Sequence, residues 1–273
     1  MEQYTFAKAS EYLGLPKKFL ENYAKIGGEL VFAKKGRAYV IDQEELDRWT
    51  ALRNYRTVSL EIEDYIQCLE FALRSFYAYT STSDFGTATQ RGAGKFVDNF
   101  TSGKLGEIAV RKFLKDKTGI DIKLDFALRD AVVGQDITEV SKPRRGPRVY
   151  NPPRLRVSIK TTKLKNVWLI VPQSELDDPA RASDIYVLAR VELSLDHAFR
   201  FLKGHALLEN ITDIIPEFEP LAAEVVGFVW KDELSAKDPV SEIPGQAIKP
   251  SYILPSGELR CSDDEWKDFV SRL

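Results

Sequence analysis

Two short amphipathic helices separated by a three-residue break most narrowly constrain what this chain can fold into. Thr5 can cap the first helix, FAKASEYL, whose apolar residues recur at helical spacing along one face. Gly14, Leu15 and Pro16 then break the helix, and Pro16 suits the first turn of a second helix, KKFLENYAK. A tight turn between two short helices is the helix-turn-helix arrangement, whose second helix can enter the major groove of DNA.

The segment after these two helices carries a basic hairpin. ELVFAKKGRAYVID contains two short β-type runs around a basic tip, which makes it a candidate wing against DNA phosphates. Asp42 can cap a third helix, QEELDRWTAL. This order resembles the winged-helix domains of the excisionase and MerR-like family, through the stretches KASEYLGLPKKFLENYAKIGGEL and GRAYVIDQEELDRW.

The resemblance assigns the basic residues of this segment to DNA contact. It places Lys17, Lys18 and Lys25 on or beside the recognition helix, and Lys34, Lys35 and Arg37 on the wing. The alternative is that these residues only solvate a small helical domain, or that the fold serves protein contacts. DNA contact is favoured because the basic residues cluster on the two elements that this geometry directs at DNA.

Composition excludes several classes of protein. The chain has 273 residues, 44% of them hydrophobic, and is long enough for one large core and a smaller module. The start, MEQYTFAKAS, lacks the features of a secretory signal, and no apolar run approaches the roughly 18 residues of a membrane helix. Cys68 and Cys261 are too few for a disulfide framework or a zinc site, and only His197 and His205 are present. These features predict a soluble cytoplasmic protein in which local basic patches must supply any nucleic-acid binding, because the net charge is -2.

One acid in the helical middle of the chain lies where a charge is costly. Residues 57–80 predict a long helix, and the Gly-, Ser- and Thr-rich stretch TSTSDFGTATQRGAGK predicts a loop. A second helix is expected to begin near Ser102 or Gly103 and to end at Gly119. On it, Glu107 lies beside the apolar face, where an unpaired carboxylate needs a cation or a hydrogen-bond network. An ordinary salt bridge is the alternative.

Four short strands are predicted after this helix, and two of them carry polar residues of interest. IDIKLDFAL, GQDITEV, LRVSIKTTK and NVWLIVP have strand-like patterns, and a proline-rich loop with Arg144, Arg145 and Arg148 joins the second to the third. If the second and third strands pair as an antiparallel hairpin, Asp136 and Lys160 face the same region. A different register would separate them.

These segments resemble the PD-(D/E)xK nuclease superfamily, and type II restriction endonucleases in particular. GKLGEIAVRKFL is similar to its first helix, GQDI and VSIK to its central hairpin, SDIYVLARV to a core strand and EVVGFVW to an edge segment. The resemblance implies an α/β fold with a mixed central sheet flanked by helices. It also implies a Mg²⁺ ion held by Asp136 with one or both of Glu107 and Glu175, and Lys160 beside the attacking water or the phosphate.

The sequence departs from the superfamily motif at two positions. Ser158 stands where an acid is expected two residues before Lys160, and Gln135 stands in place of the proline before Asp136. Glu175, on a downstream helix, or Glu107 can replace the missing carboxylate. The alternative is that catalysis is lost and the domain only binds DNA. The loop arginines either clamp phosphates and read guanine edges or only keep the loop in solution.

We therefore predict two modules, a winged helix-turn-helix domain at 1–55 and a nuclease-like domain at 56–273. The function predicted is a Mg²⁺-dependent, sequence-specific endonuclease of type II restriction type that acts on double-stranded DNA as a homodimer. The alternative is a non-catalytic DNA-binding regulator with a degenerate nuclease-like domain. The sequence contains neither the P-loop motif of ATP-driven motors nor a nucleophile elbow.

Overall fold

The structure is a computed structural model that describes residues 3–36, 38–78, 93–128, 135–143, 147–164, 166–194, 197, 220–243 and 246–273. Three of the predicted DNA-contacting residues, Arg37, Arg144 and Arg145, lie outside these ranges, as does most of the predicted loop TSTSDFGTATQRGAGK. No helix in the described ranges is long and apolar enough to cross a membrane.

Apart from its first strand, the N-terminal module has the element order that its sequence predicts. Its elements are β1 (Gln3–Thr5), α1 (Phe6–Leu13), α2 (Lys17–Ile26), β2 (Ala33–Lys35), β3 (Ala38–Asp42) and α3 (Gln43–Arg56). The Thr5 hydroxyl accepts a hydrogen bond from the Lys8 N–H, and Gly14 ends α1 in the left-handed conformation at φ 62°. Pro16 and Asp42 occupy the positions before α2 and α3, and the Asp42 carboxylate accepts a hydrogen bond from Gln3.

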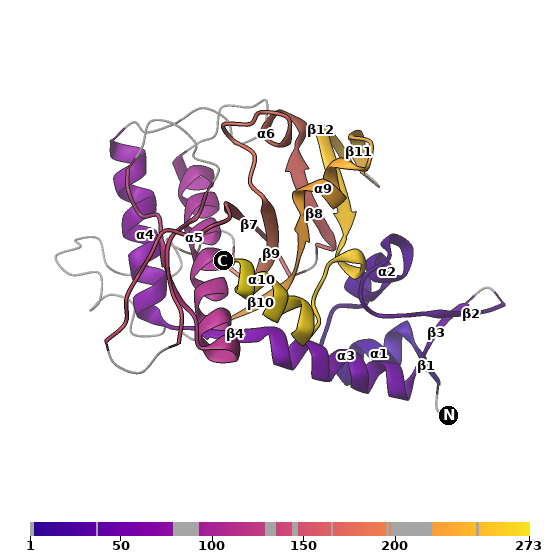
Figure 1. The fold of residues 1–273 in the computed structure, drawn as a ribbon. Coiled ribbons are helices and arrows are strands. Elements are labelled where there is room, and N and C mark those ends of the chain that lie inside the picture. Colours follow the sequence, from indigo (N-terminus) through magenta and orange to yellow (C-terminus); the bar gives the residue numbers. More distant parts are fainter. Residues whose placement is uncertain are drawn as a thin grey trace, which may run out of the picture.

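The hairpin of β2 and β3 forms the predicted wing. It projects away from the rest of the molecule, whereas α2 lies against the C-terminal segment that follows the last strand (Figure 1). β1 was not predicted and adds a third strand, in the order β1-β3-β2. The three helices enclose a core that includes Phe19, Tyr23, Leu46 and Trp49.

The larger part of the chain is built on a mixed four-stranded sheet, as the resemblance implied. The strands are β4 (Thr57–Leu60), β10 (Leu221–Trp230), β9 (Ile185–Val191) and β7 (Val157–Thr162), in the order β4-β10-β9-β7. Only β7 and β9 are parallel within this sheet. All seven residues of β9 are buried, which is expected of a strand covered on both faces.

Helices cover one face of this sheet and a second sheet covers the other (Figure 1). The helical face carries α4 (Ile62–Tyr77), α5 (Ala93–Thr118) and α10 (Asp263–Arg272). The opposite face carries β8 (Trp168–Pro172), α6 (Gln173–Leu176), α9 (Lys231–Ser235), β11 (Val240–Ile243), β12 (Gln246–Pro255) and the 3₁₀ turn η1 (Ser256–Glu258). Two separate apolar clusters fill the two interfaces.

Several predictions about these elements are wrong. The described part of the segment predicted as one helix, residues 57–78, is a strand followed by a helix, because Val58 and Leu60 point into the core from β4. α5 begins at Ala93, well before Ser102, because Phe96 and Phe100 stack at 4.1 Å and extend its apolar face. β10, which contains EVVGFVW, lies inside the sheet between β4 and β9 and is not an edge segment.

The predicted hairpin of GQDITEV with LRVSIK is also wrong. β6 (Ile137–Ser141), the strand within GQDITEV, pairs antiparallel with β5 (Asp121–Leu124) in a separate two-stranded sheet. β7 instead pairs with β9. A single backbone hydrogen bond of 2.9 Å, from the Asp136 N–H to the Val157 carbonyl, joins the start of the β6 segment to β7.

Candidate functional site

A glycine allows α5 to lie directly against β7. A Cβ atom on Gly106 would overlap the Thr161 side chain, so no larger residue fits without displacing that side chain. The Thr161 hydroxyl donates a hydrogen bond of 3.2 Å to the Gly103 carbonyl and fixes the approach. A glycine is therefore needed next to Glu107, because only a residue without a side chain lets this turn of α5 approach the sheet so closely.

Asp136 is attached to β7 by its side chain as well as by its backbone. Its Oδ2 accepts a hydrogen bond of 2.6 Å from the Ile159 N–H. This contact lies one residue before Lys160, so the acid and the lysine reach the same region although their strands do not form a ladder. The predicted proximity is correct, and its predicted cause is not.

Lys160 is held by an acid from α6. Its Nζ donates to both carboxylate oxygens of Glu175, at 2.7 and 2.8 Å. α6 directly follows β8, so Glu175 reaches Lys160 from beyond the C-terminal end of that strand. The ring of Tyr186 lies beneath the ammonium group at 5.8 Å.

Glu107 is paired with a lysine that was not predicted. The Nζ of Lys104 donates to Glu107 Oε2 at 2.7 Å and to the Asp125 carbonyl at 2.6 Å. It also lies over the rings of Phe71 and Phe126, at 5.1 and 5.2 Å from their centroids. Its position one turn before Glu107 on the same helix is the only sequence signal that could have identified it.

Glu107 and Asp136 are less stable as carboxylates inside the protein than they would be in water. Burial raises the pKa of Glu107 well above its usual value, and the charge of Asp136 raises it further, while Lys104 opposes both. Burial also raises the pKa of Asp136, against the opposing effects of Lys104, the Ile159 N–H and Lys160. At Glu107 and Asp136 the nearby positive groups therefore do not offset the effect of burial.

These residues suit a hard cation that keeps ligands from outside the protein. Within the described ranges, no three acids, histidines or cysteines are grouped closely enough to hold a metal ion by themselves. Mg²⁺ is commonly bound by one or two carboxylates together with water and substrate phosphate oxygens. Glu107 and Asp136 fit that requirement, and their raised pKa values are the property that a cation would relieve.

The predicted DNA-contacting lysines are on the surface of the N-terminal module. Lys17, Lys18 and Lys25 are exposed on α2, and Lys34 and Lys35 are exposed on β2. Lys17 and Lys18 lie 3.8 and 3.6 Å from the Glu21 carboxylate, so α2 carries an acid among its basic residues. Arg148, predicted to contact DNA from the proline-rich loop, lies in the larger part of the chain, where it is partly exposed and pairs with Asp121 at 3.2 Å.

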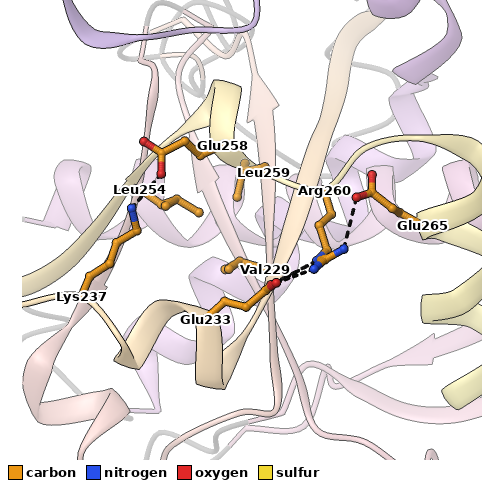
Figure 2. A pocket seen from close by; sticks show the side chains of 8 residues that line it. All are labelled: Val229, Glu233, Lys237, Leu254, Glu258, Leu259, Arg260 and Glu265. Atoms are coloured by element: carbon orange, nitrogen blue, oxygen red, sulfur yellow. Dashed lines mark hydrogen bonds and ion pairs between the residues drawn. The ribbon is translucent and has the colours of Figure 1, made fainter.

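A surface pocket of about 350 Å³ lies elsewhere, beside α9 and η1. Figure 2 shows Arg260 directed at Glu233 and Glu265, and Lys237 directed at Glu258. The Arg260 guanidinium lowers the pKa of Glu233 by hydrogen bonding. Each acid that lines this pocket is paired with Arg260 or Lys237 at the exposed surface, and we assign the pocket no chemistry.

Comparison with known proteins supports one of the two modules. Residues 4–51 match a family model described as a helix-turn-helix domain. No curated protein and no solved structure matches the chain. The N-terminal module is thus a DNA-binding helix-turn-helix domain, joined to a mixed α/β part that carries the cluster of Glu107, Asp136, Lys160 and Glu175.

Proposed function

We propose that this protein is a Mg²⁺-dependent endonuclease of the type II restriction kind that cuts double-stranded DNA at a specific sequence. The observation that carries the proposal is the pair of acids with raised pKa values, Glu107 and Asp136, beside the ordered lysine Lys160. The helix-turn-helix domain in the same chain supports DNA as the substrate.

Glu107 and Asp136 are the residues that we assign to the metal ion. Glu175 is a weaker candidate because both of its oxygens are bonded to Lys160. Ser158, which replaces the acid of the superfamily motif, cannot supply a negative ligand. When bound, Mg²⁺ would polarise the scissile phosphate and lower the pKa of a bound water.

The chain's own residues orient the reacting groups. The Ile159 N–H fixes one oxygen of Asp136, and Lys104 fixes one oxygen of Glu107. Lys160 is restrained by Glu175 and can donate a hydrogen bond to a phosphate oxygen as charge develops there. Donors held in place before the reaction stabilise the transition state without reorganisation.

The assembly proposed is a homodimer on duplex DNA. One metal site cuts one strand, so cleavage of both strands of a symmetric sequence requires two copies of the chain. Lys17, Lys18, Lys25, Lys34 and Lys35 supply the phosphate contacts of each copy, and binding should weaken steeply with salt.

A second candidate function is a DNA-binding regulator without catalysis. Two observations favour it. With Ser158 in place of the expected acid, β7 carries no acid, and Glu175 is already paired with Lys160. In this case the acid cluster would be a remnant of a nuclease site.

A digest of plasmid and phage DNA with Mg²⁺ or with EDTA distinguishes the two candidates. We expect discrete Mg²⁺-dependent bands, and a loss of cleavage on the order of 10³-fold in Asp136→Asn and in Lys160→Met, with DNA binding in a gel shift unchanged. Lys115→Met, at an exposed lysine near the end of α5, is the matched control and should cut normally. A gel shift without cleavage of any DNA would instead support the regulator, and full activity in both site variants would exclude the proposed site.

A further inference from the structure

A buried network of charged residues joins the helix-turn-helix domain to the central sheet. Glu29 follows α2, Arg56 ends α3, Arg190 lies on β9 and Glu224 lies on β10. The side chains of Arg56 and Arg190 have no exposed surface, and that of Glu224 is 2% exposed. Charges buried this deeply require partners, and here each module supplies partners for the other.

Each acid in the network faces both arginines. Glu224 lies 3.1 Å from Arg56 and 3.2 Å from Arg190, through different carboxylate oxygens. Glu29 Oε1 lies 3.6 Å from Arg56 and 3.5 Å from Arg190. Because two positive and two negative groups alternate, no single contact can be broken without leaving a buried charge poorly compensated.

Arg190 connects this network directly to α2, the second helix of the helix-turn-helix domain. Its Nη1 donates to the Tyr23 hydroxyl at 2.5 Å, and its guanidinium lies 5.4 Å from the centre of the Tyr23 ring. Its Nε donates to the Asn166 carbonyl at 2.9 Å, which fixes the arginine from the sheet side. Tyr23 lies on the inner face of α2, away from the exposed lysines of that helix.

β9, the strand that bears Arg190, also lies beside β7, which carries the lysine of the candidate site. In the parallel pairing of β7 with β9, Lys160 is opposite Leu188 and Thr162 is opposite Arg190. Two residues along a strand span about 7 Å. One strand therefore carries both the residue opposite Lys160 and the residue that holds α2.

Close packing supports this connection at the end of α2. A Cβ atom on Gly257 would lie 2.6 Å from the Gly27 carbonyl oxygen and 2.8 Å from that of Gly28, so η1 and the end of α2 are in direct contact. The Ser256 hydroxyl donates to Glu29 at 3.2 Å. Val167, which lies just before β8, is part of the core of the N-terminal module.

We propose that Arg190 is a positioning residue that holds α2 at a fixed orientation to the strand bearing Lys160, so that DNA is cut at a constant distance from the sequence read by α2. The constant distance rests on the proposed endonuclease function. The contact by which Arg190 holds α2 does not depend on that function and can be measured separately.

The first measurement maps the cut positions at single-nucleotide resolution on a duplex with one recognition sequence. We expect the full-length wild type and Arg74→Lys, an exposed arginine on α4, to cut each strand at one bond. Arg190→Lys keeps the charge but loses the multiple contacts of the guanidinium. It should bind within about twofold of the wild type in a gel shift, spread its cuts over several bonds and lose about tenfold in rate at the original bond.

A second variant tests the same role with a smaller risk of unfolding the protein. Arg190→Met combined with Glu224→Met removes one positive and one negative charge together, which spares the fold better than the removal of one partner. It should show the same spread of cut positions. A single cut at the wild-type bond and rate in either folded variant would overturn the role of Arg190.

Hydrogen exchange gives a readout that does not depend on cleavage. The amides of α2 should be as protected as those of β9 in the wild type, and about tenfold less protected in Arg190→Lys. Rapid exchange of α2 in the wild type would overturn the proposed coupling even in an active enzyme. A wild type that cuts no DNA would overturn the endonuclease proposal and the constant distance with it, and the exchange of α2 would still decide whether Arg190 holds this helix.

Discussion

Two clusters of charged side chains lie inside this protein, and they differ in charge balance. The junction network pairs Glu29 and Glu224 with Arg56 and Arg190. Burial alone would raise the pKa of Glu29, but the two arginines hold it below its usual value. In the acid cluster, burial raises the pKa of Glu107 and of Asp136, and the nearby lysines do not reverse this.

The difference follows from the number and the type of the cations. The junction has one arginine for each acid, and a guanidinium remains protonated in proteins and presents several donors in a fixed plane. The acid cluster has three acids, Glu107, Asp136 and Glu175, and two lysines, each of which is a single point of charge. A balanced cluster suits a structural role, whereas an acid excess suits the binding of a further cation.

The largest expected effect on stability comes from breaking the balanced cluster. Glu224→Gln leaves two buried arginines to share one acid, and it should lower the free energy of unfolding by about 3–5 kcal/mol. Glu107→Gln removes a carboxylate that is already unfavourable and should leave stability unchanged or raise it. Urea unfolding measures both.

Glu258→Gln is the matched control for these variants. It breaks an exposed pair with Lys237 and should cost less than about 1 kcal/mol. Equal losses in Glu224→Gln and Glu107→Gln would show that the two clusters do not differ as we infer.

The next largest effect on stability comes from adding a cation to the acid cluster. Ca²⁺ at about 100 times its dissociation constant should stabilise the wild type by about 2.7 kcal/mol, because only the folded chain assembles Glu107 and Asp136. Glu107→Gln should lose most of this gain, and Glu258→Gln should keep it. Unfolding in urea with Ca²⁺ or with EDTA gives the difference, and an equal gain in all three proteins would place the ion elsewhere.

A smaller effect tests the packing that brings the acids together. Gly106→Ala forces Thr161 to move and should lower the free energy of unfolding by about 1–3 kcal/mol. Gly103→Ala, one turn earlier on the same helix, enters open space and should raise it by about 0.5–1 kcal/mol. Thermal unfolding of the two variants is the measurement, and similar values would mean that the contact of α5 with β7 is not tight.

The smallest effect is on the pH dependence of stability. Glu107 has a raised folded-state pKa, so above its usual value of 4.5 the folded chain binds more protons than the unfolded chain, and its contribution falls as pH rises. Glu29 has a lowered pKa, so its contribution is present above 4.5 and is lost as pH falls through the folded-state value.

Urea unfolding across pH therefore separates the two acids. Relative to the wild type, Glu107→Gln should gain stability as pH rises above 4.5, by at most about 1.4 kcal/mol per pH unit. Glu29→Gln should lose relative stability as pH rises toward 4.5. Parallel profiles for all three proteins would contradict the opposite shifts.

The sequence predicted the central residues of the acid cluster better than it predicted the strands that carry them. Glu107, Asp136 and Lys160 were inferred from residue type and local pattern, and the structure brings them together. Their strands were assigned to the wrong partners, because alternation of apolar residues identifies a strand without specifying its neighbours. Lys104 was missed because a lysine on a helix normally belongs to the solvated face, and here two aromatic rings enclose it.

The sequence by itself determined the helix-turn-helix module and the identity of the polar residues. Its signals are local: Thr5 caps α1, Gly14 and Pro16 separate the helices, and Gly36 turns the wing at φ 63°. Only the tertiary structure decided which charges balance one another. Arg56 and Glu224 are 168 residues apart in the chain and 3.1 Å apart in space, and no local pattern records a contact of that kind. Charge balance depends on such contacts, because the low dielectric of the interior makes each buried charge depend on the groups packed around it.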